Sequence, residues 1–407
     1  MTLLRPFIRQ ASRPFHTCRP QFALKPPPVS VAAAAAAALT HGPLSKGIDA
    51  FRNTFGSKPL TAPFTGQAET YEQALNEAQG LVVDENGEGD KRLIFDPAKL
   101  VGPDLWELKG NLSKLLGSGH PFLNTMMTHF LCDDGQPVRP LLVLLTAQAT
   151  TGGGQIIDTQ RRLAEITQMI HAASLLHDDV LEENGDLGNK MAILAGDFLL
   201  SRASLALAYL RNAECVELMA TCIAHLVEGE FMDLVKKQPM VLTSESEADH
   251  IDNNKKNSAL EYYLDQTDMK TASLIAQSCK GSAVLGKASM DDAKYACEFG
   301  RHFGVAYQLV EDVLEFSANS SFRAGAPVMF ASESIPELLP MIERRFSQPD
   351  DHEQARLYVY QSGGLKKTLA LAESHCQSAI ESINQLPPSD ARSALAQLST
   401  NLIRRKN

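Results

Sequence analysis

Residues 172–182 read Ala-Ala-Ser-Leu-Leu-His-Asp-Asp-Val-Leu-Glu, and residues 304–315 read Gly-Val-Ala-Tyr-Gln-Leu-Val-Glu-Asp-Val-Leu-Glu. Each stretch runs from an apolar segment into an acidic cluster whose first and last carboxylates lie one helical turn apart, on the same face. Such charge is costly to bury unless a cation neutralises it. Either cluster alone is also compatible with a solvated acidic surface, but the repetition favours shared hard cations such as Mg²⁺ holding a diphosphate. The clusters are Asp178, Asp179 and Glu182, and Glu311, Asp312 and Glu315.

The composition excludes several classes of protein. The chain has 407 residues, 44% of them hydrophobic and 21% charged, which is ordinary for a globular protein with one large core or two domains. A net charge of −10 argues against a nucleic-acid partner. The seven cysteines include no C-x-x-C pair, so neither zinc nor redox chemistry is indicated. Scattered single cysteines are typical of core packing in a reducing compartment.

The amino-terminal segment differs from the rest of the chain. Residues 1–48 contain six Lys and Arg residues and no acidic residue. That pattern predicts a mitochondrial transit peptide over 1–45, the alternative being an unstructured basic tail. The alanine run at 32–38 is too short and too weakly apolar to cross a bilayer, and we expect no membrane span elsewhere. Residues 46–95 mix Gly, Pro, Thr and acids without periodicity, so we interpret them as a partly disordered linker.

Helical periodicity dominates from residue 96 onward, and no convincing alternating strand interrupts it. The pattern predicts a single all-α domain over 96–405. Some segments, such as 191–210, are apolar nearly all round, and we expect these to be central in a helical bundle. The predicted helical stretches are 101–116, 138–150, 161–182, 190–210, 212–235, 258–286, 291–316 and 351–384.

Several blocks around the clusters carry a family resemblance. Residues 188–200 read Gly-Asn-Lys-Met-Ala-Ile-Leu-Ala-Gly-Asp-Phe-Leu-Leu, residues 226–231 read Leu-Val-Glu-Gly-Glu-Phe, and Tyr262-Tyr263-Leu264 leads into 270–275, Lys-Thr-Ala-Ser-Leu-Ile. In this order the blocks resemble the trans-polyprenyl diphosphate synthases, most of all the mitochondrial type that makes the ubiquinone side chain. The resemblance extends from residue 115 to the end and implies an isoprenoid-synthase-type helical bundle with a central cavity.

The resemblance implies a reaction and its partners. A synthase of this kind condenses isopentenyl diphosphate head to tail with an allylic diphosphate, with Mg²⁺ as cofactor, and extends a polyprenyl chain along an apolar tunnel. It implies a homodimer or a heteromer with a paralogue, a mitochondrial location and possible peripheral contact with the inner membrane.

By the same resemblance, specific residues take specific roles. The two acidic clusters would be the metal ligands, and Lys270 would neutralise the leaving diphosphate, with Thr271 and Gln308 lining the site. Substrate-binding positions would be His120 and Arg139 for isopentenyl diphosphate, Lys190, and the small Ala173 and Ser174 under the growing chain. Each role has a structural alternative: Lys270 is an exposed helix lysine, His120 caps a turn, and Ala173 and Ser174 are simple helix-packing positions.

The chain also departs from the family pattern. Both clusters end in Glu where the family has Asp, and Gln136 stands in place of a lysine. The segment after the first cluster, 182–189, is short and lacks the paired arginine of the family. The segment after the second cluster, 316–325, is also short and lacks the family's lysine. Each lost cation removes charge-assisted hydrogen bonds to a diphosphate, roughly 1.5–3 kcal/mol each. A degenerate paralogue and a gene model that omits coding sequence are both compatible with this pattern.

Three functions therefore stay open at the level of sequence. The first is a working polyprenyl diphosphate synthase with an altered site. The second is a non-catalytic partner subunit of an active paralogue. The third is a class I terpene cyclase, against which the absence of a matching second motif of Asn, Ser and Glu argues.

Overall fold

The computed structural model describes residues 97–116, 137–178, 185–237, 259–317 and 324–404, and every regular element in these ranges is a helix. The all-α class predicted from periodicity is therefore confirmed. The helices are α4 (Pro97–Leu100), α5 (Gly102–Leu116), α7 (Val138–Thr150), α8 (Asp158–Asp178), α9 (Gly185–Tyr209), α10 (Ala213–Lys237), α11 (Ala259–Thr267), the π-helix η2 (Asp268–Ala272), α12 (Ser273–Leu285), α13 (Met290–Ser317), α14 (Ala326–Ser334), α15 (Leu338–Glu343), α16 (Asp351–Ser362), α17 (Gly364–Ile383) and α18 (Asp390–Arg404).

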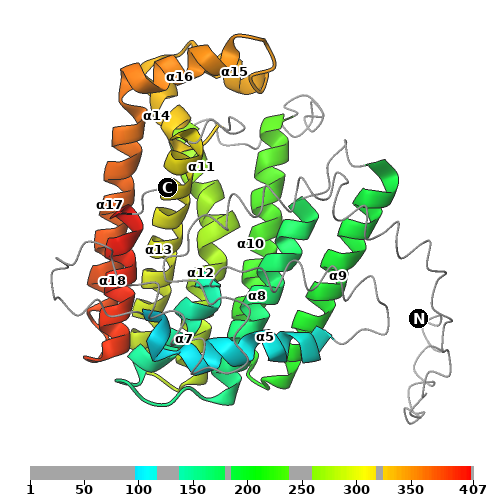
Figure 1. Ribbon diagram of the computed structural model, residues 1–407, viewed down its shortest axis with the longest axis vertical. Helices are drawn as coiled ribbons and strands as arrows, with labels where there is room; N and C mark the ends of the chain where they lie inside the picture. The colour runs from blue at the N-terminus through cyan, green and yellow to red at the C-terminus, as the bar shows by residue number, and fades with distance from the viewer. Residues whose placement is uncertain (1–96, 117–136, 179–184, 238–258, 318–323, 405–407) are drawn as a thin grey trace, which may run out of the picture.

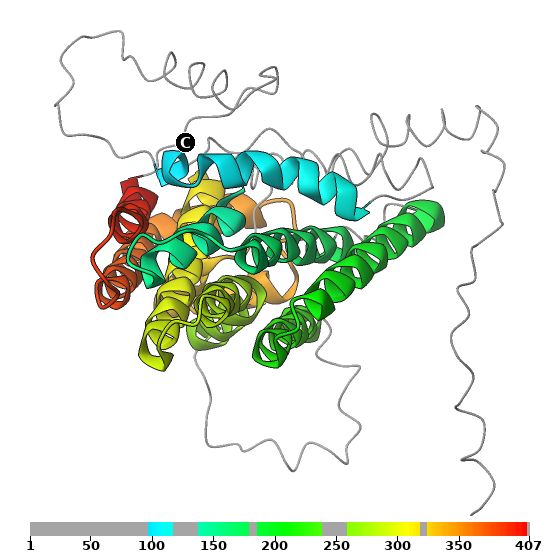
Figure 2. The ribbon, with the colours of Figure 1, turned by 90° about the horizontal axis from the view of Figure 1, so that it is seen from below.

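The long helices run roughly side by side in one bundle, with α5 lying across them at one end (Figure 1; Figure 2). The closest packing joins α13 to both α17 and α12, and α8 to α9. This arrangement brings the ends of α8 and α13, where the two acidic clusters begin, onto the same bundle although more than a hundred residues separate them.

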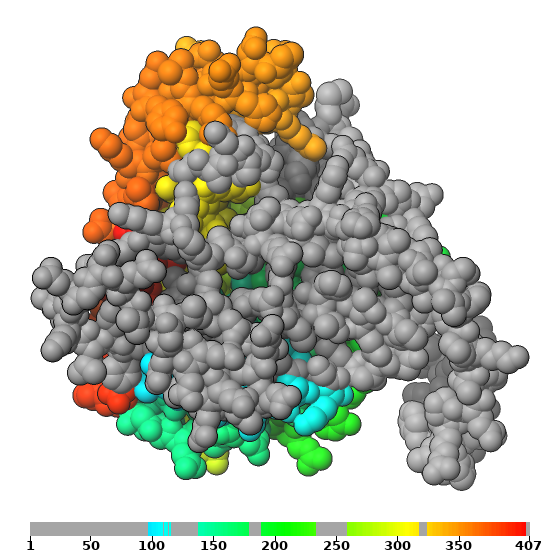
Figure 3. Space-filling view, viewed as in Figure 1, coloured from blue at the N-terminus to red at the C-terminus, as the bar shows by residue number. Residues whose placement is uncertain are grey.

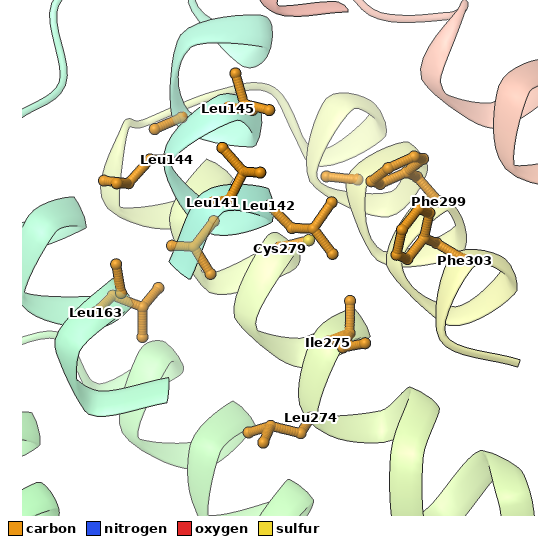
Figure 4. Packing of buried hydrophobic residues seen from close by; sticks show 14 of the residues in the cluster. Leu141, Leu142, Leu144, Leu145, Leu163, Leu274, Ile275, Cys279, Phe299 and Phe303 are labelled. Atoms are coloured by element: carbon orange, nitrogen blue, oxygen red, sulfur yellow. The ribbon is translucent and has the colours of Figure 1, made fainter. Parts of the chain in front are cut away.

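Helix α12 is the central helix of the bundle. Apart from a few partly exposed positions, its side chains are buried, and it packs against α7, α8, α10 and α13. Ile275 and Cys279 of α12 lie between Leu142 of α7 and the phenylalanines Phe299 and Phe303 of α13, within the main hydrophobic cluster (Figure 4). Other helices therefore cover α12 on most of its faces.

Glycine allows α12 and α13 to approach at backbone distance. A Cβ atom on Gly300 would lie 2.8 Å from the Cα atom of Ala276. A Cβ atom on Gly304 would lie 2.6 Å from the Cα atom of Ala272. Both distances are shorter than real contacts of this kind, so the close packing of α13 against η2 and α12 depends on these two glycines.

The prediction that segment 191–210 is central was wrong. Helix α9 packs mainly on α8 and leaves Ile193, Leu194, Leu205 and Tyr209 exposed by 43%, 51%, 47% and 71%. The stretch Asn189–Tyr209 has a mean hydropathy of 1.5 and is long and apolar enough to cross a membrane by length and composition, with 39% of it buried inside the protein. Hydropathy alone did not reveal that the apolar surface of α9 faces outward.

A second, smaller hydrophobic cluster lies beyond the end of α13. Phe316 of α13 packs there with residues of α14, α15 and α16, which form one end of the molecule (Figure 1; Figure 3). The guanidinium of Arg356 lies over the Phe316 ring at 5.3 Å and donates to its carbonyl at 2.9 Å. Arg344 and Asp351 form a two-bond ion pair with distances of 2.8 and 2.5 Å. These contacts hold the cluster against the bundle.

Most predicted helical stretches correspond to observed helices within a few residues. The predicted stretch 351–384 is two helices, because Gly363 adopts a left-handed φ of 69° between α16 and α17. Helices α4, α14, α15 and α18 were not predicted. The transit peptide predicted over 1–45 and the linker predicted over 46–95 lie outside the described residues.

Candidate active site

The helical segment 259–285 changes its winding at the position of Lys270 and Thr271. Residues Asp268–Ala272 form a π-helical turn between α11 and α12. Single π turns inside α-helices are rare and are frequent at functional sites. Here the turn leaves Lys270 partly exposed and buries Thr271. Lys270, predicted to neutralise the leaving diphosphate, and Thr271, predicted to line the site, therefore lie on a locally reshaped backbone.

A chain of hydrogen bonds leads from this turn to the second acidic cluster. The Thr271 hydroxyl donates to Oε1 of Gln308 at 3.1 Å, and Nε2 of Gln308 donates to Oδ1 of Asp312 at 3.0 Å. Oδ2 of Asp312 accepts from the Tyr263 hydroxyl and from the backbone N–H of Ala326 at 2.8 Å. Burial, with the neighbouring Asp312 carboxylate, holds the pKa of Tyr263 well above its ordinary value, so its hydroxyl stays a donor. The structure thus brings together Thr271, Gln308 and Asp312, three of the predicted site residues, and their roles stay predictions.

Lys270 is paired with a carboxylate of α10. Its Nζ forms an ion pair with Glu230, and both side chains are about one-third exposed, at 30% and 37%. A Cβ atom on Gly229 would lie 2.5 Å from Cγ of Lys270, so only glycine lets α10 approach the lysine this closely. The pair holds an accessible cation at the η2 turn, where an anionic ligand would compete with Glu230 for it.

Arg139, near the start of α7, is partly buried and interacts with side chains of α8 and α13. Its Nη1 lies 2.9 Å from Nε2 of His171. Burial lowers the pKa of Arg139 to about 10, while Tyr307 and Glu311 oppose that shift, so the guanidinium remains charged near neutral pH. Burial, and secondly the charge of Arg139, holds the pKa of His171 well below 6.5. A neutral His171 accepts the hydrogen bond from Arg139.

The neutral His171 predicts a loss of stability in acid. Its folded-state pKa is lowered, so between that pKa and 6.5 the unfolded chain binds more protons than the folded chain. The free energy of unfolding should therefore fall as the pH drops below about 6.5. His302 and His375, whose pKa values burial also lowers, contribute with the same sign. Urea unfolding midpoints measured from pH 7.5 to pH 5 test this expectation.

The variant His171→Gln isolates the contribution of one histidine. The amide oxygen of Gln occupies nearly the place of Nε2 and still accepts from Arg139, but it does not titrate. We expect the midpoint of the variant to fall less steeply in acid than that of the wild type. Equal slopes in the two proteins would contradict the assignment of a buried, neutral His171.

The first acidic cluster is described only at its first residue. Asp178 is the last residue of α8 and is exposed, whereas Asp179 and Glu182 lie outside the described residues. The preceding His177 packs directly on Gly196 of α9. A Cβ atom at that position would lie only 2.2 Å from Nε2 of His177, so the contact requires glycine. Its Nε2 is 3.5 Å from Oδ1 of Asp197. The end of α8 is therefore fixed on α9 directly before the cluster.

The remaining predicted positions have different environments. Ala173 is fully buried in the main hydrophobic cluster, and the hydroxyl of Ser174 donates to the carbonyl of His171 at 3.0 Å. Lys190 is exposed on α9, and His120 lies outside the described residues. Ala173 is thus a packing position in this structure, and the roles of these four residues in substrate binding stay predictions.

The carboxylates of the two acidic clusters are suitable ligands for a hard divalent cation, with the exception of Asp312. Carboxylate oxygens are the ligands that Mg²⁺ prefers. Both oxygens of Asp312, however, already accept hydrogen bonds from protein donors. Within the described residues, no group of three or more His, Cys, Asp or Glu side chains is placed to hold a metal ion. Asp178, Glu311 and Glu315 remain the described candidates.

Comparison with known proteins identifies the family. A model of the family described as "Polyprenyl synthetase" matches residues 120–325. The chain is 38% identical over 376 residues to the "Probable hexaprenyl pyrophosphate synthase, mitochondrial" of Neurospora crassa, covering 76% of this chain and 82% of that protein. The chain belongs to the polyprenyl synthetase family. It is also 37% identical over 352 residues to "Decaprenyl-diphosphate synthase subunit 1" of Schizosaccharomyces pombe, covering 75% and 90%.

Solved structures of polyprenyl synthetases have the same fold. The apo form of an Arabidopsis medium/long-chain length prenyl pyrophosphate synthase is 35% identical, with a TM-score of 0.59, 76% coverage of this chain and 99% of that chain. A polyprenyl synthase from Caulobacter crescentus, complexed with calcium and isoprenyl diphosphate, is 24% identical, with a TM-score of 0.64 and coverage of 76% and 97%. The resemblance and the helical bundle that it implied are therefore confirmed.

Three contacts of this polyprenyl synthetase site were missed from sequence. Glu230 and Tyr263 stood inside blocks that matched the family, but no role was predicted for either. His171 lies seven residues before Asp178, on the same face of α8, and this spacing was an available signal. Glu230 pairs with Lys270, 40 residues further along the chain, and Tyr263 pairs with Asp312, 49 residues further along. Only the fold reveals partners at such separations.

Proposed function

We propose that the protein is a long-chain polyprenyl diphosphate synthase that condenses isopentenyl diphosphate with an allylic diphosphate, with Mg²⁺, for ubiquinone biosynthesis in mitochondria. The main support is the convergence of two cations and a carboxylate cluster from distant helices. Arg139 of α7 interacts electrostatically with Glu311 of α13, and the η2 turn that carries Lys270 is hydrogen-bonded to α13 through Thr271 and Gln308. Membership in the family and the mitochondrial relative support the same proposal.

The residues suit the two diphosphates of this reaction. Lys270 offers its charge to the allylic diphosphate as the bond between carbon and oxygen breaks, which lowers the free energy of the departing anion. Arg139, held in place by His171, offers a planar donor to the diphosphate of isopentenyl diphosphate. The double bond of isopentenyl diphosphate attacks the allylic cation, a proton leaves, and the chain grows by one isoprene unit. Bound Mg²⁺ would supply positive charge to the diphosphate from Asp178, Glu311 and Glu315.

We propose a long product because the residues before the first cluster are small. Ala173 and Ser174 leave no aromatic ring beneath the growing chain. The full burial of Ala173 means that chain growth would require neighbouring side chains to move apart. The proposal is tested by incubating the purified chain with farnesyl diphosphate, labelled isopentenyl diphosphate and Mg²⁺ and measuring product length. Products that stop at the first additions would contradict a long-chain synthase.

A second candidate function is a non-catalytic partner subunit of an active polyprenyl synthase. The commitment of Asp312 to protein donors, together with the missing cation at Gln136 and the short segments after the clusters, favours this alternative. The word "subunit" in the name of the Schizosaccharomyces pombe relative is compatible with it. The same assay separates the two functions when this chain is measured alone and after mixing with an active polyprenyl synthase. A partner subunit is inactive alone and raises the rate of the active synthase.

Either function is consistent with an oligomer formed through α9 and α10. The exposed apolar residues repeat at helical spacing, at 194, 205 and 209 on α9 and at 216, 227 and 231 on α10. Exposed apolar residues that line one face of a helix are typical of interaction sites. We propose a second polyprenyl synthase chain as the occupant, with the inner membrane surface as the competing one.

Introducing charge on these helices should separate the subunits. We expect Leu194→Glu with Phe231→Glu to convert a dimer into a monomer in light scattering at micromolar concentration, because a buried unpaired charge costs several kcal/mol. The matched control is Tyr360→Glu, which alters an exposed aromatic residue on α16. A double variant that stays dimeric but no longer binds anionic vesicles would assign the surface to the membrane instead.

A further inference from the structure

The environment of Asp312 differs from that of a carboxylate kept for a metal ion. Its side chain is 8% exposed. Oδ1 accepts from Gln308, and Oδ2 accepts from both the Tyr263 hydroxyl and the Ala326 backbone. Three neutral protein donors therefore satisfy the hydrogen-bonding capacity of this buried carboxylate.

One of the donors belongs to the first residue of α14. The first N–H groups of a helix have no partner within the helix, and the end of the helix carries partial positive charge. Gly325, at the N-cap position of α14, has no side chain of its own that could accept from them. Asp312 fills that role from α13, at 2.8 Å from the nitrogen of Ala326.

The local geometry leaves little space for any other arrangement. A Cβ atom on Gly325 would lie 2.9 Å from both Cγ and Oδ2 of Asp312. The backbone before α14 thus lies directly on the carboxylate. At the other end of the network, Thr271 and Gln308 connect Asp312 to the η2 turn that carries Lys270. One continuous set of hydrogen bonds therefore joins the diphosphate-binding turn to α14.

We propose that Asp312 is a structural anchor that docks α14 against the site, and that Tyr263 is the positioning residue that holds Asp312 in this role. The inference rests on the proposed function only in naming the site, since the anchor itself is a property of the fold. It assigns the coordinating work of the second cluster to Glu311 and Glu315.

Hydrogen exchange in the metal-free protein tests the anchor. With EDTA present, we expect Tyr263→Phe and Asp312→Asn to raise amide exchange in α14 several-fold while α9 and α10 remain as in the wild type. Tyr262→Phe is the matched control, because its neighbouring hydroxyl donates to the carbonyl of Met232 on α10 at 2.9 Å and not to Asp312. Equal exchange of α14 in the variants of Tyr262 and Tyr263, or unchanged exchange after Asp312→Asn, would overturn the proposal.

A second arm uses Mg²⁺ with inorganic diphosphate and reads the melting temperature. We expect these ligands to raise it in the wild type and in Asp312→Asn, but not in Asp178→Asn, which removes an exposed carboxylate of the first cluster. Loss of the rise in Asp312→Asn, with α14 exchange unchanged, would make Asp312 a metal ligand and overturn the anchor. If the wild type shows no rise at all, the proposed function loses its support, while the exchange in EDTA still decides the anchor.

Discussion

Replacing Lys270 by alanine is expected to lower kcat/KM for isopentenyl transfer about 100-fold, the effect of losing a charge-assisted contact worth about 2.7 kcal/mol in the transition state. The lysine lies on the π turn, paired with Glu230 and accessible to an anion. Its cation is needed most when negative charge develops on the departing diphosphate. The loss should therefore appear mainly in kcat, and Lys270→Arg should recover part of it.

The matched control for this change is Lys294→Ala. Lys294 is a largely exposed lysine of α13 that pairs with Glu298 one turn further on, so its removal changes the net charge equally. We expect that variant to keep the wild-type rate. Equal activity of Lys270→Ala and the wild type, with both proteins folded, would mean that Lys270 does not contact the reacting diphosphate.

Gly304→Ala is expected to give the largest loss of stability among small substitutions. The new Cβ atom would lie 2.6 Å from Cα and 2.9 Å from Cβ of Ala272, and a backbone atom has no rotamer by which to move aside. Overpacking of this kind costs about 1–3 kcal/mol or more, against which the better helix propensity of alanine returns about 1 kcal/mol. We expect a melting temperature several degrees lower and a displaced η2 turn.

Gly110→Ala provides the matched control on α5. No atom lies within 4 Å of the Cβ that alanine would add there. The same substitution should therefore stabilise the protein by about 0.5–1 kcal/mol through helix propensity alone. Differential scanning calorimetry of the two variants measures the contrast, and a stabilised Gly304→Ala would show that α13 and η2 are not as close as described.

Sequence predicted the helices well where clear start and end signals bound an apolar run. Helix α7 was predicted with its observed bounds, Val138–Thr150, because it combines an apolar run with a proline start and a glycine-rich end. The predicted stretch 258–286 hid the π turn, since a shift in hydrogen bonding leaves the apolar pattern intact. The break at Gly363 was signalled by the Gly363-Gly364 pair but was overridden by the periodicity on both sides.

The site was predictable in its residues and not in their partners. The resemblance selected Lys270, Thr271, Gln308, Arg139 and the acidic clusters. It did not reveal that Asp312 bonds to Tyr263 and to the start of α14. The sequence of an acidic cluster is the same whether its carboxylates bind a cation or accept hydrogen bonds from protein donors. The outward face of α9 was missed for a similar reason, since apolar residues look alike whether they face a core or another subunit.

A single-turnover experiment with the purified chain in excess over labelled farnesyl diphosphate, with isopentenyl diphosphate and Mg²⁺, tests the central claim most directly. Because the protein is in excess, each farnesyl diphosphate is extended without any need for product to leave and the protein to bind a second one, so the experiment separates chemistry from product release. The proposed synthase predicts that label moves from farnesyl diphosphate into longer prenyl diphosphates, and that Lys270→Ala slows this transfer about 100-fold. Label that stays in farnesyl diphosphate, in a protein that is folded and binds inorganic diphosphate with Mg²⁺, would contradict a catalytic role for this chain.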